Sequence, residues 1–112
     1  MTDTTLDRRV WPRFPLILAA EVIEQSSGAR LSGRTSDVSR TGCYVDTLNP
    51  IPAGSGVRIL LMQGDESVEL LGRVIYTSPG LGMGLCFDQP VPPPHLAILD
   101  RWLASAARVE SS

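Results

Sequence analysis

The amino-acid sequence predicts a mainly β fold, a six-stranded antiparallel β-barrel followed by one C-terminal α-helix. Three observations lead to this prediction. Short apolar segments alternate with clusters of turn-forming residues between residues 16 and 88. One segment near the C-terminus then repeats its apolar residues with a helical period. Finally, 112 residues are enough for one compact core, and neither an internal repeat nor a second domain is visible.

The expected strands share a short length, a β-rich composition and turn residues at their ends. They span residues 16–24, 30–39, 43–47, 57–63, 68–77 and 82–87. The turn-rich sequence Gln25–Gly28 separates the first two, and Gly64–Glu66 after the fourth is a good hairpin signal. Short strands at regular spacing are typical of a small antiparallel barrel.

The last expected strand has two different faces. Met83, Leu85 and Phe87 lie two residues apart and therefore share one apolar face. The alternate positions are unusually small: Gly82, Gly84 and Cys86. Such a face indicates the close approach of a backbone or a ligand.

A helix is expected over residues 94–108, after the proline cluster Pro90–Pro94. Its apolar residues recur at spacings of three and four and form one stripe: Leu96, Leu99, Leu103 and Ala106. Such a stripe would close one end of the barrel. The expected divisions of the chain are a flexible polar leader at 1–7 and a domain at 8–108, comprising an arginine-rich arm at 8–15, the barrel at 16–88 and the helix.

Composition limits the partners that this domain could bind. The formal net charge is −2, and aromatic residues make up only 5% of the chain. The first value disfavours non-specific binding to a nucleic acid polymer, and the second gives little support to a stacking platform for single strands. Met1–Asp7 does not resemble a signal peptide, and no apolar run reaches the ~18 residues that span a bilayer. We therefore expect a cytoplasmic protein without membrane insertion.

Residues suited to catalysis or metal binding are few. His95 is the only histidine, and its place at the expected helix start favours a surface or helix-start role. No nucleophile elbow, zinc-protease pair or phosphate-binding loop occurs. Cys43 and Cys86 lack a metal-binding spacing; we expect two buried free thiols on strands, and a disulfide is the alternative. The sequence therefore predicts no enzyme, no metal site and no cofactor.

The arginine-rich arm is the first candidate for ligand binding. All 10 cationic side chains of the protein are arginines, and Arg8, Arg9 and Arg13 lie close together. Arginine carries a planar fork that binds phosphate in a bidentate manner and stacks on flat rings. It also favours the O6/N7 edge of guanine. Pro12 and Pro15 oppose a regular helix here, and a solvated arm without a ligand is the alternative interpretation.

The second candidate is Asp37-Val38-Ser39-Arg40-Thr41-Gly42, at the end of the second expected strand. Asp37 and Ser39 are two residues apart, so an extended chain projects both from one face. A carboxylate beside a hydroxyl can accept hydrogen bonds from the N1–H and N2–H₂ edge of guanine. Gly42 permits a positive φ or lets a ligand lie against the backbone. The alternative is a turn in which Asp37 and Ser39 bind local backbone donors.

Together the two motifs resemble the PilZ domain family, whose signature is R-x-x-x-R followed by [D/N]-x-S-x-x-G. Here the two motifs are Arg9–Arg13 and Asp37–Gly42. The resemblance continues through Gly72–Tyr76, Gly82–Phe87 and the terminal helix, and covers about residues 8–104. It implies a six-stranded PilZ-type barrel that binds the bacterial second messenger cyclic di-GMP at its outer surface and acts as a receptor in signalling.

The resemblance also implies a role for each motif residue. Arg9 and Arg13 would contact phosphate and the O6/N7 edge of guanine, one guanidinium also stacking on a base. Asp37 and Ser39 would hold a guanine through its other polar edge. Gly42 would keep the path to the ligand clear.

Two further arginines enter through the same resemblance. In similar proteins an arginine directly before R-x-x-x-R, here Arg8, accompanies the binding of two stacked ligands. Arg40, inside the second motif, is a candidate for phosphate contact because of its proximity alone. In this interpretation the ligand orders a mobile arm over the barrel and thereby alters contacts with a downstream protein partner. The alternatives are a PilZ-like adaptor that binds no ligand and acts by protein–protein interaction, and a small barrel that binds RNA or single-stranded DNA.

Overall fold

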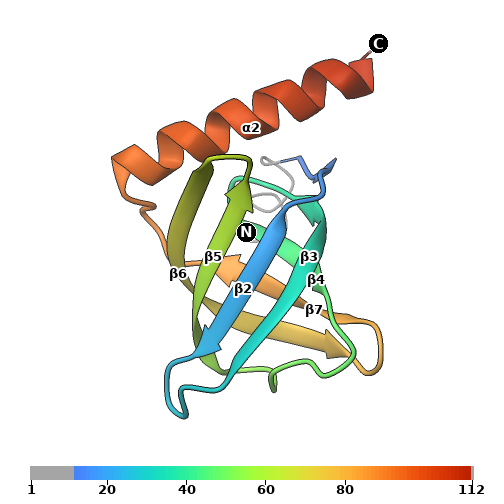
Figure 1. The fold of residues 1–112 in the computed structure, drawn as a ribbon, viewed down its shortest axis with the longest axis vertical. Coiled ribbons are helices and arrows are strands. Elements are labelled where there is room, and N and C mark those ends of the chain that lie inside the picture. The colour runs from blue at the N-terminus through green and yellow to red at the C-terminus, as the bar shows by residue number, and fades with distance from the viewer. Residues whose placement is uncertain (1–11, 112) are drawn as a thin grey trace, which may run out of the picture.

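The computed structural model describes residues 12–111 of the chain. This range contains seven strands and one helix (Figure 1). Their bounds are β1 Phe14–Pro15, β2 Ala19–Glu24, β3 Arg30–Val38, β4 Gly42–Asp46, β5 Gly56–Gln63, β6 Glu66–Ser78, β7 Gly82–Phe87 and α2 Pro93–Ser111. Strands β2 to β7 correspond to the six expected from the sequence. Strand β1 is additional, and it lies inside the segment that we expected as the arginine arm.

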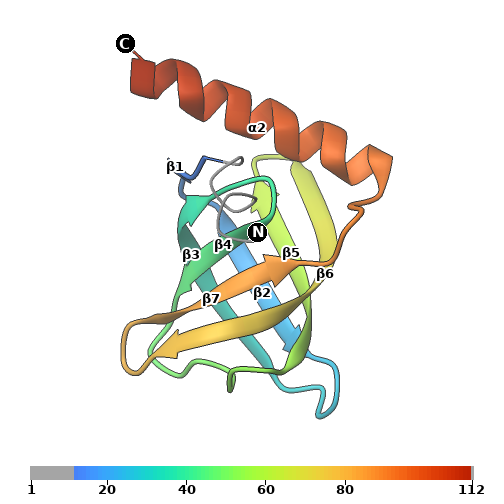
Figure 2. The ribbon, with the colours of Figure 1, turned by 180° about the vertical axis from the view of Figure 1, so that it is seen from behind.

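The barrel closes because β3 and β4 pair with each other in addition to their other neighbours. The strand order is β3-β2-β5-β6-β7-β4, and every pair is antiparallel. Figures 1 and 2 show α2 lying across one end of the barrel, with the turn between β2 and β3 at the opposite end. The predicted six-stranded antiparallel barrel with a C-terminal helix is therefore confirmed.

Two boundaries follow from local chemistry. Gln63 pairs with Glu66 across a two-residue turn in which Gly64 has a φ of 59°, so the expected hairpin is confirmed. Strand β2 begins at Ala19 and not at residue 16. The backbone of Leu16 and Leu18, just before it, instead hydrogen-bonds to the side chain of Thr35 on β3.

The core lies inside the barrel and beneath α2. Met83, Leu85 and Phe87 are each no more than 2% exposed, which confirms the inward face expected for the last strand. From the helix, Leu99 and Trp102 are also buried, so the predicted apolar stripe packs on the barrel end. No helix among the described residues has the length and apolar character needed to cross a bilayer.

The outer face of β7 explains why this strand carries glycines. A Cβ atom on Gly84 would overlap the ring of Tyr76. One on Gly82 would overlap the ring of Tyr44 and the backbone of β4. The predicted close approach is therefore confirmed, and tyrosine rings together with a neighbouring strand occupy the space that side chains would need.

The two cysteines differ in exposure. Cys43 on β4 is buried and free, as expected. Cys86 is free but exposed, so the prediction of two buried thiols was wrong for this residue. The reason is the alternation of β7, in which both neighbours of Cys86 point into the core and Cys86 must therefore point outward.

Candidate functional site

The candidate site lies where β1 meets the end of β3, near the end of the barrel that α2 covers (Figure 2). Strand β1 pairs antiparallel with β3, with Phe14 opposite Val38 and Pro15 opposite Asp37. Pro15 has no N–H to donate, which suits a short strand at the edge of a sheet. This pairing brings the first half of the signature, at Arg13, beside the second half.

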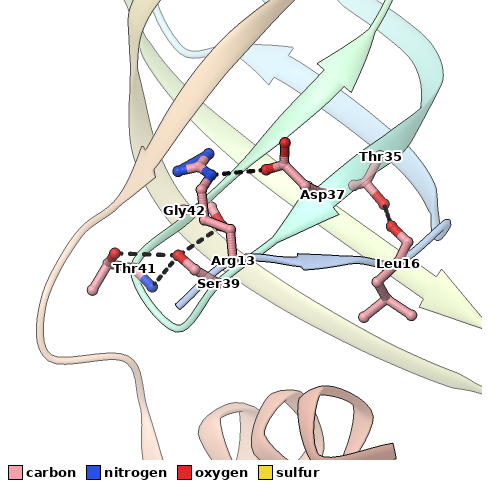
Figure 3. A network of polar contacts seen from close by, with 7 residues as sticks. All are labelled: Arg13, Leu16, Thr35, Asp37, Ser39, Thr41 and Gly42. Carbon is pink, nitrogen blue, oxygen red and sulfur yellow. Dashed lines mark hydrogen bonds and ion pairs between the residues drawn. The ribbon is translucent and has the colours of Figure 1, made fainter. Parts of the chain in front are cut away.

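Arg13 and Asp37 form an ion pair at the protein surface. The Nε–H of Arg13 donates to Oδ1 of Asp37 at 2.9 Å, and the two side chains are 47% and 37% exposed (Figure 3). This contact uses one donor of the guanidinium and one oxygen of the carboxylate. The remaining donors and acceptors of the pair face a surface that solvent can reach, so a ligand with opposite polarity could engage both groups.

Ser39 belongs to a tight turn between β3 and β4. Its side chain is buried, accepting a hydrogen bond from the N–H of Thr41 at 3.2 Å and donating to the carbonyl of Gly42 at 3.3 Å (Figure 3). The N–H of Ser39 donates to the same carbonyl at 2.8 Å. The turn alternative therefore describes Ser39 well, and only Asp37 of the expected acceptor pair is partly exposed to solvent.

Gly42 is required by packing and not by an unusual backbone conformation. Its φ is not positive. A Cβ atom here would overlap the carbonyl oxygen of Leu85 on β7, with which β4 pairs. The glycine of the second motif thus allows β4 to approach β7, and in this way it fixes the position of the turn.

Arg40 points from the same turn toward the helix. Its Nε and Nη2 atoms donate to the two carboxylate oxygens of Asp100 at 3.0 and 3.3 Å. The side chains are about one third and one half exposed. In the structure Arg40 therefore connects the site turn to α2.

Arg8 and Arg9 lie outside the described residues. The structure therefore shows Arg13, Asp37, Ser39 and Gly42 gathered at one place, and the geometry of the other two arginines stays a prediction.

Thr35 is a positioning residue that the sequence did not reveal. It is 1% exposed, and its Oγ1 donates to the carbonyl of Leu16 at 2.7 Å (Figure 3). The same oxygen accepts from the N–H of Leu18 at 2.8 Å. The backbone N–H of Thr35 also donates to Leu18. These bonds fasten the link between β1 and β2, and with it the position of Arg13. The one feature of the sequence that could have indicated this role is a polar residue at an inward-facing position of a strand.

Two tyrosines lie beside the ion pair. Tyr44 is the cross-strand partner of Asp37, so both side chains stand on the same face of the barrel. The ring of Tyr76 on β6 is 6.1 Å from that of Tyr44 at an angle of 37°, and Tyr76 is 46% exposed. Together they provide an aromatic surface next to a carboxylate, on which a flat heterocycle can stack.

The groups around the site offer no reactive nucleophile or metal centre among the described residues. Burial raises the pKa of the Cys43 thiol to about 12, and the nearby positive charge of Arg13 only partly opposes this effect. No three His, Cys, Asp or Glu side chains in the described range could together hold a metal ion. His95 lies in the first turn of α2, and its Nδ1 accepts from the N–H of Glu69 at 3.3 Å. This agrees with the expected helix-start role.

Comparisons with known proteins agree with this architecture. Three solved structures share the fold, each covering about nine tenths of this chain. The PilZ domain with c-di-GMP of YcgR from Escherichia coli has a TM-score of 0.73 at 17% identity, covering 92% of this chain and 94% of that one. The PilZ domain of CeSA from a cellulose-synthesizing bacterium has a TM-score of 0.64 at 20% identity, with 88% and 98% covered.

The third structure is the Bacillus subtilis inhibitor of motility, MotI/DgrA, with a TM-score of 0.68 at 14% identity. It covers 88% of this chain, which in turn spans only 51% of that protein. No curated protein sequence matches the chain. The family model described as PilZ domain matches residues 7–105, which include both signature motifs, all seven strands and most of α2. The chain therefore belongs to the PilZ domain family.

Proposed function

We propose that this protein is a receptor for cyclic di-GMP, with no catalytic activity of its own. The observation that carries the proposal is the contact between Arg13 of the arm and Asp37 of β3 at the barrel surface. A guanidinium and a carboxylate side by side offer the two polarities that phosphate and the N1–H/N2–H₂ edge of guanine require. Membership of the PilZ family supports the same ligand, and one structural neighbour is a PilZ domain with c-di-GMP.

On ligand binding, Asp37 would exchange its partner Arg13 for a guanine of the ligand. The exposed ion pair with Arg13 stabilises the free protein by only about 0–1 kcal/mol. Guanine would donate two hydrogen bonds to the same carboxylate, and bonds to a charged group contribute ~1.5–3 kcal/mol each. The exchange therefore favours the ligand, and it releases Arg13 to bind a phosphate or the O6/N7 edge of a guanine.

The neighbouring residues complete the proposed site. Arg9 supplies the second cation of the arm, and Arg8 supports a second, stacked ligand. Tyr44 and Tyr76 supply a stacking surface beside Asp37. The hydroxyl of Ser39 holds the turn that carries this face, and it reaches the ligand only by giving up a hydrogen bond inside the turn.

The proposed response is an ordering of the arm. Three arginines within six residues repel one another, and two phosphates would neutralise that repulsion. The arm would then lie across the face that carries Asp37, starting from the β1–β3 pairing that already fixes its C-terminal end. Ordering the arm changes the surface that a downstream protein meets.

Isothermal titration calorimetry with cyclic di-GMP tests the proposal. We expect saturable binding by the wild type, and affinities about ten- to a hundred-fold lower for Arg13→Ala and Asp37→Ala, because each loses a charge-assisted contact. Arg58→Ala is the matched control, since its guanidinium pairs with Glu69 away from this site. Arg8→Ala should lower the stoichiometry from two ligands to one. Wild-type affinity in both Arg13→Ala and Asp37→Ala would mean that the ligand binds elsewhere.

A second candidate function is that of an adaptor that binds partner proteins without the nucleotide. The satisfied Arg13–Asp37 pair and the internal bonds of Ser39 favour it, because these groups have partners without a ligand. A ligand that binds only the native state must raise the melting temperature. An unchanged melting temperature at saturating cyclic di-GMP would therefore select the adaptor.

A further inference from the structure

Strand β3 has an edge that no neighbouring strand covers in the described part of the chain. Strand β2 pairs with residues 30–34 along one edge of β3. Strand β4 pairs along the other edge, but its register ends where Asp46 meets Arg34. The chain then leaves the sheet as the loop 47–55. The backbone of Asp46 still lies against Gly33, so the β4-side edge of β3 is open from Arg30 to Ser32.

The hydrogen-bonding pattern shows which backbone groups line this open edge. The N–H of Glu24 donates to the carbonyl of Ala29, and the N–H of Thr35 donates to Leu18. These bonds place the odd-numbered residues of β3 in the ladder with β2. Arg30 and Ser32 consequently direct their N–H and C=O groups away from β2, toward the open edge. An unpaired edge of this kind is a template for another extended chain.

A groove runs along the open edge, at the end of the barrel away from α2. The cavity measures about 700 Å³ and lies between β3 and the loop residues 47–52. Leu31 and Ile51 contribute apolar surface to it, and Leu48 on the loop is 77% exposed. A strand residue occupies about 160 Å³ at the usual rise, strand spacing and sheet spacing, so the groove has room for about four residues.

One end of the groove carries the carboxylate of Glu24, which has no arginine partner among the described residues. Glu24 lines the cavity beside the β2–β3 turn, and its carboxylate accepts from the hydroxyl of Ser27 at 2.7 Å. Hydrogen bonds from Ser27 and then Ser55 lower the pKa of Glu24, so the group is ionised at neutral pH. The nearby guanidinium of Arg30 is directed to Glu21, at 3.3 Å. A cationic side chain would therefore complement this end.

We propose that the groove binds an extended segment of a partner protein, which adds to β3 as a strand. Its backbone would pair with Arg30 and Ser32, its apolar side chains would cover Leu31 and Ile51, and a lysine or arginine would reach Glu24. Main-chain pairing provides affinity in this mode of recognition, and the pockets for alternate side chains provide specificity. The surface lies at the barrel end opposite α2 (Figure 1), so the inference is independent of nucleotide binding.

A short synthetic peptide provides the test. The probe is acetyl-KTVTVT-amide, which places one lysine and two valines on the same face of a strand. Titrated without nucleotide into the ¹⁵N-labelled protein, it should shift the amide signals of Arg30 and Ser32 and protect these amides from hydrogen exchange. The same peptide with alternate amides N-methylated cannot pair with β3 and should not bind. Equal binding of the methylated peptide, or no shift at these two amides, would overturn the proposal.

Two variants test the contributions of backbone pairing and of charge to peptide binding separately. Ser32→Pro removes a donor at the open edge and leaves the β2 ladder intact, because proline is tolerated where the N–H faces away from the sheet. It should lower peptide affinity about ten-fold and keep wild-type cyclic di-GMP binding. Glu24→Gln should abolish the preference for the lysine peptide over acetyl-ETVTVT-amide, whereas the control Asp65→Asn should retain it. If Ser32→Pro does not fold, the methylated peptide on the wild type decides the same point.

A second copy of the chain is the competing occupant of the groove. Sedimentation velocity of the wild type would then report a dimer, with the amides of Arg30 and Ser32 protected before any peptide is added. That result would replace the proposed partner by self-association. A monomer with rapidly exchanging amides at both positions, followed by protection on adding the lysine peptide, would support the proposal.

Discussion

Replacing Thr35 by valine should destabilise the protein and loosen the arm at the same time. Valine has nearly the shape of threonine but lacks the hydroxyl, so the substitution removes two hydrogen bonds without opening a cavity. It leaves the N–H of Leu18 without an acceptor in a buried position and the carbonyl of Leu16 without a donor in a partly buried one. Both of these hydrogen bonds join the link between β1 and β2 to β3.

The size of the effect follows from the burial of each group. An unsatisfied buried donor costs about 1–3 kcal/mol, and the loss of a partly solvated bond about 0.5–1.5 kcal/mol. We therefore expect Thr35→Val to lower the free energy of unfolding by about 2–4 kcal/mol in urea. For a domain near 100 residues this corresponds to a melting temperature about 10–20 °C lower.

Thr47→Val is the matched control. The Thr47 hydroxyl accepts from the N–H of Asn49 at 3.3 Å in an exposed loop, so its removal should change stability by less than about 1 kcal/mol. Cyclic di-GMP affinity should fall several-fold for Thr35→Val and stay unchanged for Thr47→Val, because only Thr35 fixes the strand that follows Arg13. If the two variants lost the same small amount of stability, the claim that Thr35 anchors the arm would be refuted.

Three further outcomes are expected. A thiol reagent should label one cysteine quickly in the native protein, the exposed Cys86, while Cys43 reacts only on unfolding because it is buried with a raised pKa; equal rates would contradict this. The pKa of Glu66 lies below its ordinary 4.5, chiefly through a hydrogen bond from an arginine on α2. Its stabilising effect should therefore be present above pH 4.5 and disappear as the pH falls through the lowered value. In thermal melts from pH 7 to 3, the melting temperature of Glu66→Gln should therefore fall less than that of the wild type. Asp100→Asn should change the free energy of unfolding by less than about 1 kcal/mol and leave cyclic di-GMP affinity equal or higher, which urea titration and calorimetry would measure.

The sequence was sufficient to predict the barrel because its signals are local. The alternation from Met83 to Phe87 and the turn at Gly64 are read within a few residues, and both are confirmed. The stripe of α2 is local in the same sense. Strand β1 was missed because two residues carry no periodicity, and its pairing depends on an edge of β3 that the sequence alone cannot locate.

The site depends on long-range contacts, which local sequence patterns alone do not predict. Arg13 and Asp37 meet across 24 positions of sequence, and only the chemistry of a shared ligand suggested that they would. The need for glycine at Gly42 depends on the approach of β7, to which this residue is not close in sequence. Thr35 resembled any polar residue of a half-exposed strand until the link between β1 and β2 supplied its partners.

Arg40 pairs with α2 in the structure, and its contact with a ligand phosphate stays a proposal. It was a candidate for phosphate contact, and in the structure both its bonds to Asp100 join segments 60 positions apart. That ion pair is more than one third exposed on the carboxylate side, so solvent screening limits it to about 0–1 kcal/mol. A charge-assisted bond to a phosphate contributes ~1.5–3 kcal/mol, which is enough to draw the guanidinium away from Asp100. We therefore expect a bound phosphate to compete with Asp100 for the Arg40 guanidinium. A loss of nucleotide affinity in Asp100→Asn would show instead that the helix must hold Arg40 for the ligand to bind.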